Sequence, residues 1–249
     1  IGSGLVGSEM CIRDREFIRI WNRINLFSYT RGCNRFIGLK LTFEEYLKRF
    51  NEFNISDDFY NWINNTKQLS NASLEKAISE TNSNDLKKIL NWSIEVNKSI
   101  KNSNKEGEPF EGVVSAFNEI FKKTDIACVS SANKEAVIKE WESSGLLKLC
   151  KFVFTQEEGT KADCIKKLIQ QFGYNERNIL MIGDSYGDYD SAKINNVYFY
   201  PILFNKEEKS WNSFREIYLE KFINNSFSEV QEKLLSDFNI NFENGIKNI

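Results

Sequence analysis

The chain has 249 residues, of which 41% are hydrophobic and 27% charged, so it is long enough to bury a core and form one or two domains. Its net charge of -2, without a basic block, gives no indication of a nucleic acid or anionic membrane partner, and no apolar run is long enough to span a membrane. The absence of histidine excludes Ser-His and Cys-His catalysis and histidine-ligated zinc, so acid–base chemistry must use carboxylates or lysine.

The cysteines indicate a reducing compartment. Their positions show neither the spacing of a metal site nor a paired pattern, and the chain carries no secretory signal. We therefore expect a cytoplasmic protein. The five cysteines are Cys11, Cys33, Cys128, Cys150 and Cys164.

The first fifteen residues do not read as native sequence. The segment from Leu5 to Arg15 looks like a sequencing-transposon adapter translated in one frame, joined to a natural reading frame that starts near Glu16. We therefore interpret residues 1–15 as an adapter translation and exclude them from the fold prediction. The alternative is a natural but unpatterned N-terminal tail.

Residues 16–107 are predicted to be all-helical. Their apolar residues recur at spacings of three and four, the period of a helix with one buried face. The polar segment from Asn102 to Glu108 is the clearest linker in the chain. The apolar positions that carry this prediction include Phe17, Ile20, Trp21, Ile24, Phe43, Tyr46, Leu47, Leu86, Ile89 and Leu90.

Residues 108–249 alternate between helical patterns and short apolar runs. Such alternation predicts an α/β domain with a parallel sheet and helices on both faces. The C-terminal part, from Lys206 to about Asp237, is predicted to be helical again. The expected strands are Ile126 to Ser130, Phe152 to Thr155, Ile179 to Ile182 and Val197 to Pro201.

Two aspartates follow the third of these strands. Ile179 to Ile182 is followed by Gly-Asp184 and, four residues later, by Asp188, where a helix is predicted to begin. The carboxyl edge of a parallel sheet is where ligands bind, and two hard oxygen ligands there suit Mg²⁺. The alternative is that both aspartates only cap the helix.

Two serines and a lysine follow the first and second predicted strands, as the two aspartates follow the third. Ser130 and Ser131 end the first strand, and a hydroxyl with free backbone N–H groups at the start of the next helix could hold phosphate. An ordinary helix cap is the alternative there. Lys161 opens the helix after the second strand, where the helix dipole disfavours a cation, so we expect it to have a partner or a function.

The order of these features resembles that of the haloacid dehalogenase superfamily of phosphohydrolases. In that family a strand ends in Ser or Thr, a Lys follows in a later loop, and an acidic cluster follows a further strand. Ser130, Lys161 and the pair Asp184 and Asp188 match these three motifs in order. The segment from Pro109 to Val114 is similar to the family's entry into the helix before the second motif.

The resemblance implies a Rossmann-like, HAD-like α/β core at residues 108–249 and a helical cap domain at residues 16–107. Mg²⁺ would be held by Asp184 directly and by Asp188 directly or through water. Lys161 would neutralise the phosphate, and Ser130 with the N–H of Ser131 would hold a phosphate oxygen. The implied reaction is hydrolysis of a small phosphorylated metabolite through an aspartyl-phosphate.

The family's first motif, Asp-x-Asp at the end of the central strand, has no match here. It supplies the nucleophile and the general acid. We therefore expect a chain truncated before its first motif, with the central first strand missing and no phosphatase activity of its own. The oligomeric state cannot be read from the sequence.

The cap would read the leaving group of the substrate. Arg31, Asn34 and Arg35 would lie on one helix face if a helix ran through this segment, since spacings of three and four align. These residues would then form an anion-reading surface. The alternative is a solvated polar face, and Gly32 weakens the helical premise.

Other functions remain open on the same scaffold. One is a phosphate-binding or regulatory protein without turnover, and another is a phosphomutase. A carbon–halogen hydrolase is less favoured, because it has no need of a two-carboxylate Mg²⁺ site.

Overall fold

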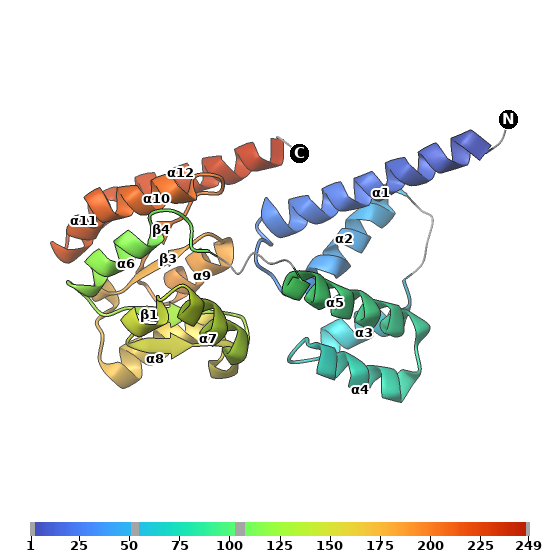
Figure 1. Cartoon of the computed structure of the whole chain (residues 1–249), viewed down its shortest axis with the longest axis horizontal. Helices are drawn as coiled ribbons and strands as arrows, with labels where there is room; N and C mark the ends of the chain where they lie inside the picture. The colour runs from blue at the N-terminus through green and yellow to red at the C-terminus, as the bar shows by residue number, and fades with distance from the viewer. Residues whose placement is uncertain (1–2, 51–54, 103–107, 248–249) are drawn as a thin grey trace. The chain divides into compact units, whose positions relative to one another are not determined.

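The computed structural model describes residues 3–50, 55–102 and 108–247, and it divides into two compact units, Ile1–Asn104 and Lys105–Asn248 (Figure 1). The first unit is built from helices throughout its described residues, as the sequence predicts. The N-terminal segment forms part of its first helix, and the origin of that segment stays a prediction. The helices are α1 (Ser3–Leu26), α2 (Arg35–Arg49), α3 (Asp57–Asn65), α4 (Asn71–Thr81) and α5 (Asn84–Asn102).

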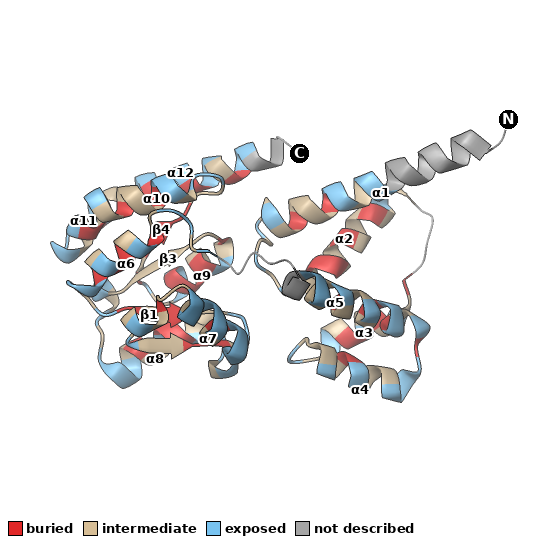
Figure 2. Ribbon diagram, in the orientation of Figure 1, coloured by how far each residue is buried: buried red, intermediate tan, exposed pale blue. Residues whose placement is uncertain are grey.

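The core of the first unit is aromatic. Phe36 of α2 and Trp62 of α3 meet edge to face, with ring centroids 4.9 Å apart. Phe59 and Leu86 are fully buried in the same cluster. Figure 2 shows buried residues interspersed with exposed ones along these helices, which is the amphipathic arrangement that the three-and-four spacing predicts.

The second unit contains four short parallel strands close to the predicted positions. They form two separate two-stranded sheets among the described residues, and in this the structure differs from the single sheet expected. The strands are β1 (Ala127–Val129), paired with β2 (Phe152–Phe154), and β3 (Leu180–Gly183), paired with β4 (Tyr198–Pro201).

Helices connect and cover these strands. α7 links β1 to β2, α8 links β2 to β3, and α9 links β3 to β4, so each strand pair is a parallel crossover unit. The predicted C-terminal helical region is confirmed, with a π-helical turn at Phe214–Tyr218. The bounds are α6 (Val113–Phe121), α7 (Lys134–Ser143), α8 (Lys161–Phe172), α9 (Tyr186–Ile194), α10 (Glu207–Ser213), α11 (Leu219–Ile223) and α12 (Ser228–Lys247).

Both faces of the β3–β4 sheet are covered, as the sequence predicts. Leu180 and Ile182 of β3 pack in a cluster with α6 and the π-helical turn. Ile179 and Met181 pack on the other side in a cluster with α8, α9 and α12. Burial on both faces explains why this strand is an uninterrupted apolar run in the sequence. Within the described residues, no helix is both long and apolar enough to cross a membrane.

Candidate active site

Asp184 lies at the carboxyl end of β3, where the sequence places it. The strand ends at Gly183 and helix α9 begins at Tyr186, so Asp184 stands in the turn between them. Its side chain is half-buried. The N-cap of α9 is Ser185, so Asp184 is not the cap of this helix. Its carboxylate therefore stands at the edge of the sheet where α/β proteins bind ligands.

Asp188 has a different environment, because it is only 2% exposed. One carboxylate oxygen, Oδ2, accepts hydrogen bonds from the Ser185 hydroxyl at 2.8 Å and from the backbone N–H groups of Ser185 and Asp184 at 3.2 Å. Ser185 and Asp188 thus form a reciprocal capping box at the start of α9. This oxygen therefore caps helix α9, which is the alternative to metal binding that the sequence left open.

Lys161 is the partner of the other oxygen of Asp188. It is the first residue of α8, and its Nζ donates a hydrogen bond to Asp188 Oδ1. The side chains of Lys161 and Asp188 are 26% and 3% exposed. The sequence leads us to expect a partner for a lysine at this unfavourable end of a helix, and the partner is a buried carboxylate. The contact joins the carboxyl ends of β2 and β3.

Gly183 is required by the close approach of Asp188. A Cβ built at this position would lie 2.4 Å from Asp188 Cγ, which no real Cβ tolerates. The Gly-Asp sequence after the strand therefore has a packing reason: any side chain at residue 183 would displace the buried carboxylate and the start of α9.

Ser130 and Ser131 follow β1 as predicted. The backbone N–H of Ser130 donates to Phe154 O at 2.9 Å, which continues the pairing with β2. The Ser130 hydroxyl oxygen accepts the N–H of Ala132 at 3.2 Å, so its own proton can still be donated to an anion. Ser131 is exposed. This turn can offer hydroxyl and backbone donors to a phosphate.

The N-terminus of α7, in contrast, is already occupied by groups of this chain. The Asn133 side chain caps the N–H of Ala136 at 2.9 Å, and the Glu157 carboxylate accepts the N–H of Lys134 at 3.1 Å. Hydrogen bonds from the Thr155 hydroxyl and from this N–H hold the pKa of Glu157 below its usual value. The expectation of free N–H groups at this helix start is therefore wrong for Lys134 and Ala136.

The comparison with protein families decides the identity of the chain. Residues 39–202 match the family of haloacid dehalogenase-like hydrolases, which is well over half of the sequence. The chain belongs to this family. No curated protein and no solved structure matches it.

In this family member, only a few of the described side-chain oxygens at the site could bind a metal ion. Within the described residues, no group of three or more His, Cys, Asp or Glu side chains could hold a metal ion. Mg²⁺, however, is commonly bound through one or two carboxylates, with water and substrate phosphate completing its shell. Asp184 fits that role, whereas Asp188 could contribute only its Oδ1, which Lys161 now occupies.

The predicted anion-reading face of the helical unit is not formed. Arg31 lies in the turn before α2, and Asn34 is the N-cap of that helix, so the premise of one continuous helix is wrong. Gly32 has a positive φ of 76°, which ends any helical run. Arg31 instead donates to the carbonyl of Leu26 at 3.0 Å.

Asn34 and Arg35 have structural contacts within the same unit. The Asn34 amide donates to Leu69 O at 3.0 Å and caps α2 through the N–H of Phe36. Arg35 donates to Asn97 Oδ1 at 2.7 Å and to the carbonyl of Ser93 at 3.3 Å, which ties α2 to α5. Both side chains therefore hold the helices of this unit together.

Sequence reasoning missed the residues that orient the site. Ser185 fixes Asp188, and the Thr155 hydroxyl lies 2.5 Å from a carboxylate oxygen of Glu157 and 2.7 Å from one of Glu158, so its proton can be donated to either. The signal was present in the sequence, because Ser185 to Asp188 and Thr155 to Glu158 both have the spacing of a capping box.

Proposed function

We propose that this family member is an Mg²⁺-dependent hydrolase of a small phosphorylated metabolite, with its site at the carboxyl ends of β1, β2 and β3. The observation that carries the proposal is the cluster of Lys161, Asp184 and Asp188 at that edge. Phosphate transfer needs a cation, a carboxylate and hydrogen-bond donors. Here these groups are Lys161, Asp184 and the turn of Ser130 and Ser131 after β1.

Lys161 would bind the phosphate, and Asp188 would position it. The ammonium group of Lys161 is held by a carboxylate that is itself fixed by three further donors, so its place is determined before substrate arrives. A preorganised cation of this kind stabilises the extra charge of the transition state without moving. Ser130 and the N–H of Ser131 would bind a phosphate oxygen.

Asp184 would be the direct Mg²⁺ ligand, with Asp188 a second ligand, directly or through water. When bound, the ion would reduce repulsion between the phosphate and an attacking carboxylate. Resemblance to the family places that attacking carboxylate, and the general acid, on a strand that corresponds to none of the described strands. On this proposal the described residues bind phosphate and Mg²⁺, and hydrolysis needs that attacking carboxylate in addition.

Binding of inorganic phosphate with Mg²⁺ tests the assignment directly. We would titrate the chain with phosphate by ³¹P NMR and with Mg²⁺ by calorimetry. Lys161→Met should abolish phosphate binding, whereas Lys166→Met, an exposed lysine on the same helix, should leave it unchanged. Asp184→Asn should remove Mg²⁺ binding and Asp190→Asn should not. Equal effects within either pair would refute the assigned roles.

A non-catalytic phosphate-binding protein is the second candidate. It is favoured by the observation that every described element before β1 is a helix, so that none is a strand ending in two aspartates. Extending the chain with an apolar strand that ends in Asp-x-Asp separates the two. Hydrolysis of p-nitrophenyl phosphate by the extended chain, lost with Asp184→Asn, would support the enzyme, and binding without turnover would support the alternative.

A further inference from the structure

Asn195 stands at the end of α9 and contacts the first turn of α8. It is the C-cap of α9, and its side chain is half-buried. The side-chain amide donates one hydrogen bond to the carbonyl of Ala162 at 3.0 Å and one to the carbonyl of Ser191 at 2.9 Å. Because an amide group has two N–H donors, these two bonds use both of them and fix the orientation of the side chain.

The carbonyl held by Asn195 belongs to the residue next to Lys161. Lys161 and Ala162 are the first two residues of α8. Helix α9 therefore contacts this turn in two places. Asp188, near the start of α9, accepts a hydrogen bond from the side-chain Nζ of Lys161. Asn195, at the end of α9, binds the backbone beside the Cα of the same lysine.

The other contacts at the start of α8 act elsewhere. Its capping box is made by Thr160 and Asp163, which bond to each other and are exposed, so the box starts the helix without fixing it against α9. Further along α8, Ile165 packs in the same buried cluster as Ala192 of α9. That apolar contact sets the spacing of the two helices one turn later, whereas the amide of Asn195 acts on the first turn.

The position of a lysine head group depends on both ends of its side chain. The four-carbon stem of Lys161 is flexible, so its Nζ is placed by the carboxylate that holds it and by the backbone turn that carries it. A cation helps to bind and stabilise phosphate only if its position is determined in advance. A shift of the first turn of α8 would therefore displace the ammonium group or weaken its bond to Asp188.

We propose that Asn195 is a positioning residue for Lys161. By holding the carbonyl of Ala162 against α9, it fixes the backbone turn from which the lysine reaches Asp188, and so sets where the ammonium group meets a phosphate. This inference rests on the proposed function, because phosphate binding by Lys161 is its outcome. It adds to the site a residue that touches neither phosphate nor metal.

An ordinary helix cap is the competing role for this side chain. Asparagine is common at the C-terminal ends of helices, and the bond from Asn195 to Ser191, four residues earlier in α9, would serve that purpose alone. If capping were the whole role, its removal would lower stability and leave Lys161 as it was. The bond to Ala162 lies between two helices, and positioning therefore predicts an effect on Lys161 itself.

The ¹⁵N NMR signal of the Lys161 ammonium group measures this effect without phosphate. An ammonium group that is held by a buried carboxylate exchanges its protons with water slowly enough to give a resolved signal, and Lys161→Met identifies that signal by its loss. In Asn195→Ala its exchange should speed up by roughly threefold or more. The Kd for inorganic phosphate, measured by ³¹P NMR, should rise by roughly three- to tenfold, as expected for the loss of one hydrogen bond.

A second variant and two controls separate positioning from stability. Asn195→Asp keeps the size of the side chain but has no N–H donors, so it should act like Asn195→Ala. Ser191→Ala removes a hydrogen bond to Gly187 within α9 and leaves the contact to Ala162 in place. Asn196→Gly changes the exposed neighbour, whose φ of 55° suits glycine. Neither control should alter the Lys161 signal or the Kd, with every variant measured well below its melting temperature.

Three results would overturn the proposal: no resolved Lys161 signal in the unaltered chain, unchanged exchange in both Asn195 variants, or an equal change in Ser191→Ala. A failure of the proposed function gives a different result. In that case the unaltered chain would not bind phosphate, while the ammonium signal would still show whether Asn195 holds Lys161 in place.

Discussion

Replacing Asp188 by alanine should destabilise the second unit strongly. The change removes the N3 side chain of the capping box and leaves Lys161 without its carboxylate. Breaking a fully buried ion pair costs roughly 3–5 kcal/mol. Because the Lys161 side chain is 26% exposed and can regain water, we expect a total of about 2–4 kcal/mol.

Urea denaturation, followed by tryptophan fluorescence, measures this loss. With a slope of about 2 kcal/mol/M, the midpoint should fall by roughly 1–2 M. Asp163→Ala is the matched control, since Asp163 holds the same position in the capping box of α8 but is exposed. Its midpoint shift should be several times smaller. Equal shifts for the two variants would refute the view that the buried contact to Lys161 stabilises the fold.

Three further outcomes follow from the site and its surroundings. Lys161→Met should lower the free energy of unfolding by about 1–2 kcal/mol, measured by the same urea titration, because Asp188 keeps its other donors. Gly183→Ala should cost about 1–3 kcal/mol by crowding Asp188, and the paired change Gly183→Ala with Asp188→Ala should recover part of that cost in a double-mutant cycle. Burial raises the pKa of the Cys128 thiol from 9.0 to about 12, so the thiol ionises in the unfolded chain before it does in the folded one. The free energy of unfolding should therefore fall between pH 9 and about 12. Cys128→Ala should reduce that fall, and an unchanged pH profile would contradict the role given to Cys128.

The positions of the strands along the chain were predictable because buried strands appear in a sequence as short apolar runs. β3 and β4 lie within one residue of their predicted ends, and their neighbours shift by a similar amount. The partner of Lys161 was not predictable, since Asp188 is distant in the chain and the contact depends on how α8 and α9 pack. The face expected for Arg31, Asn34 and Arg35 failed because a glycine turn and an N-cap divide the segment.

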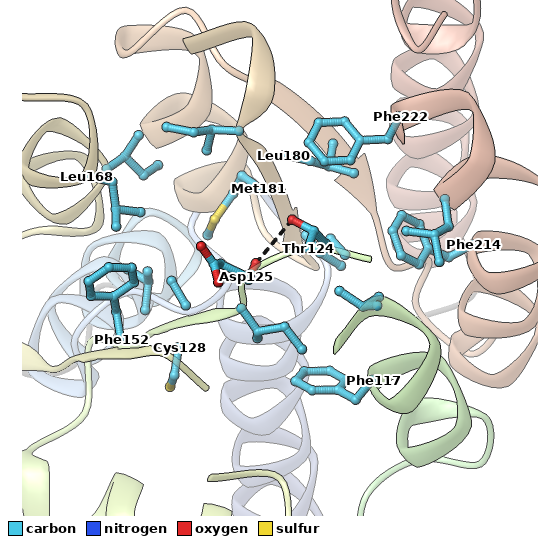
Figure 3. A pocket seen from close by; sticks show the side chains of 18 of the residues that line it. Phe117, Thr124, Asp125, Cys128, Phe152, Leu168, Leu180, Met181, Phe214 and Phe222 are labelled. Carbon is cyan, nitrogen blue, oxygen red and sulfur yellow. Dashed lines mark hydrogen bonds between the residues drawn. The ribbon is translucent and has the colours of Figure 1, made fainter. Parts of the chain in front are cut away.

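A cavity of about 340 Å³ lies between β1 and β3 (Figure 3), and its lining could not be read from the sequence. The missing central strand stays a prediction. Residues from helices on both sides contribute to it, including Phe214 of the π-helical turn. At about 24 cal/mol per Å³, a void of about 340 Å³ would cost about 8 kcal/mol if the walls did not relax. That is comparable to the whole stability of a typical domain. We therefore expect the second unit to be poorly stable.

The division of the strands into two pairs has a consequence for folding kinetics. Each pair consists of two strands that are close in the chain and connected by one crossover helix. Each strand pair can therefore form from local contacts at little cost in loop entropy. No backbone ladder connects the two pairs among the described residues, and their coupling therefore depends on side-chain packing. The pairs should behave as separate foldons, with β1 and β2 opening to solvent at a different free energy from β3 and β4.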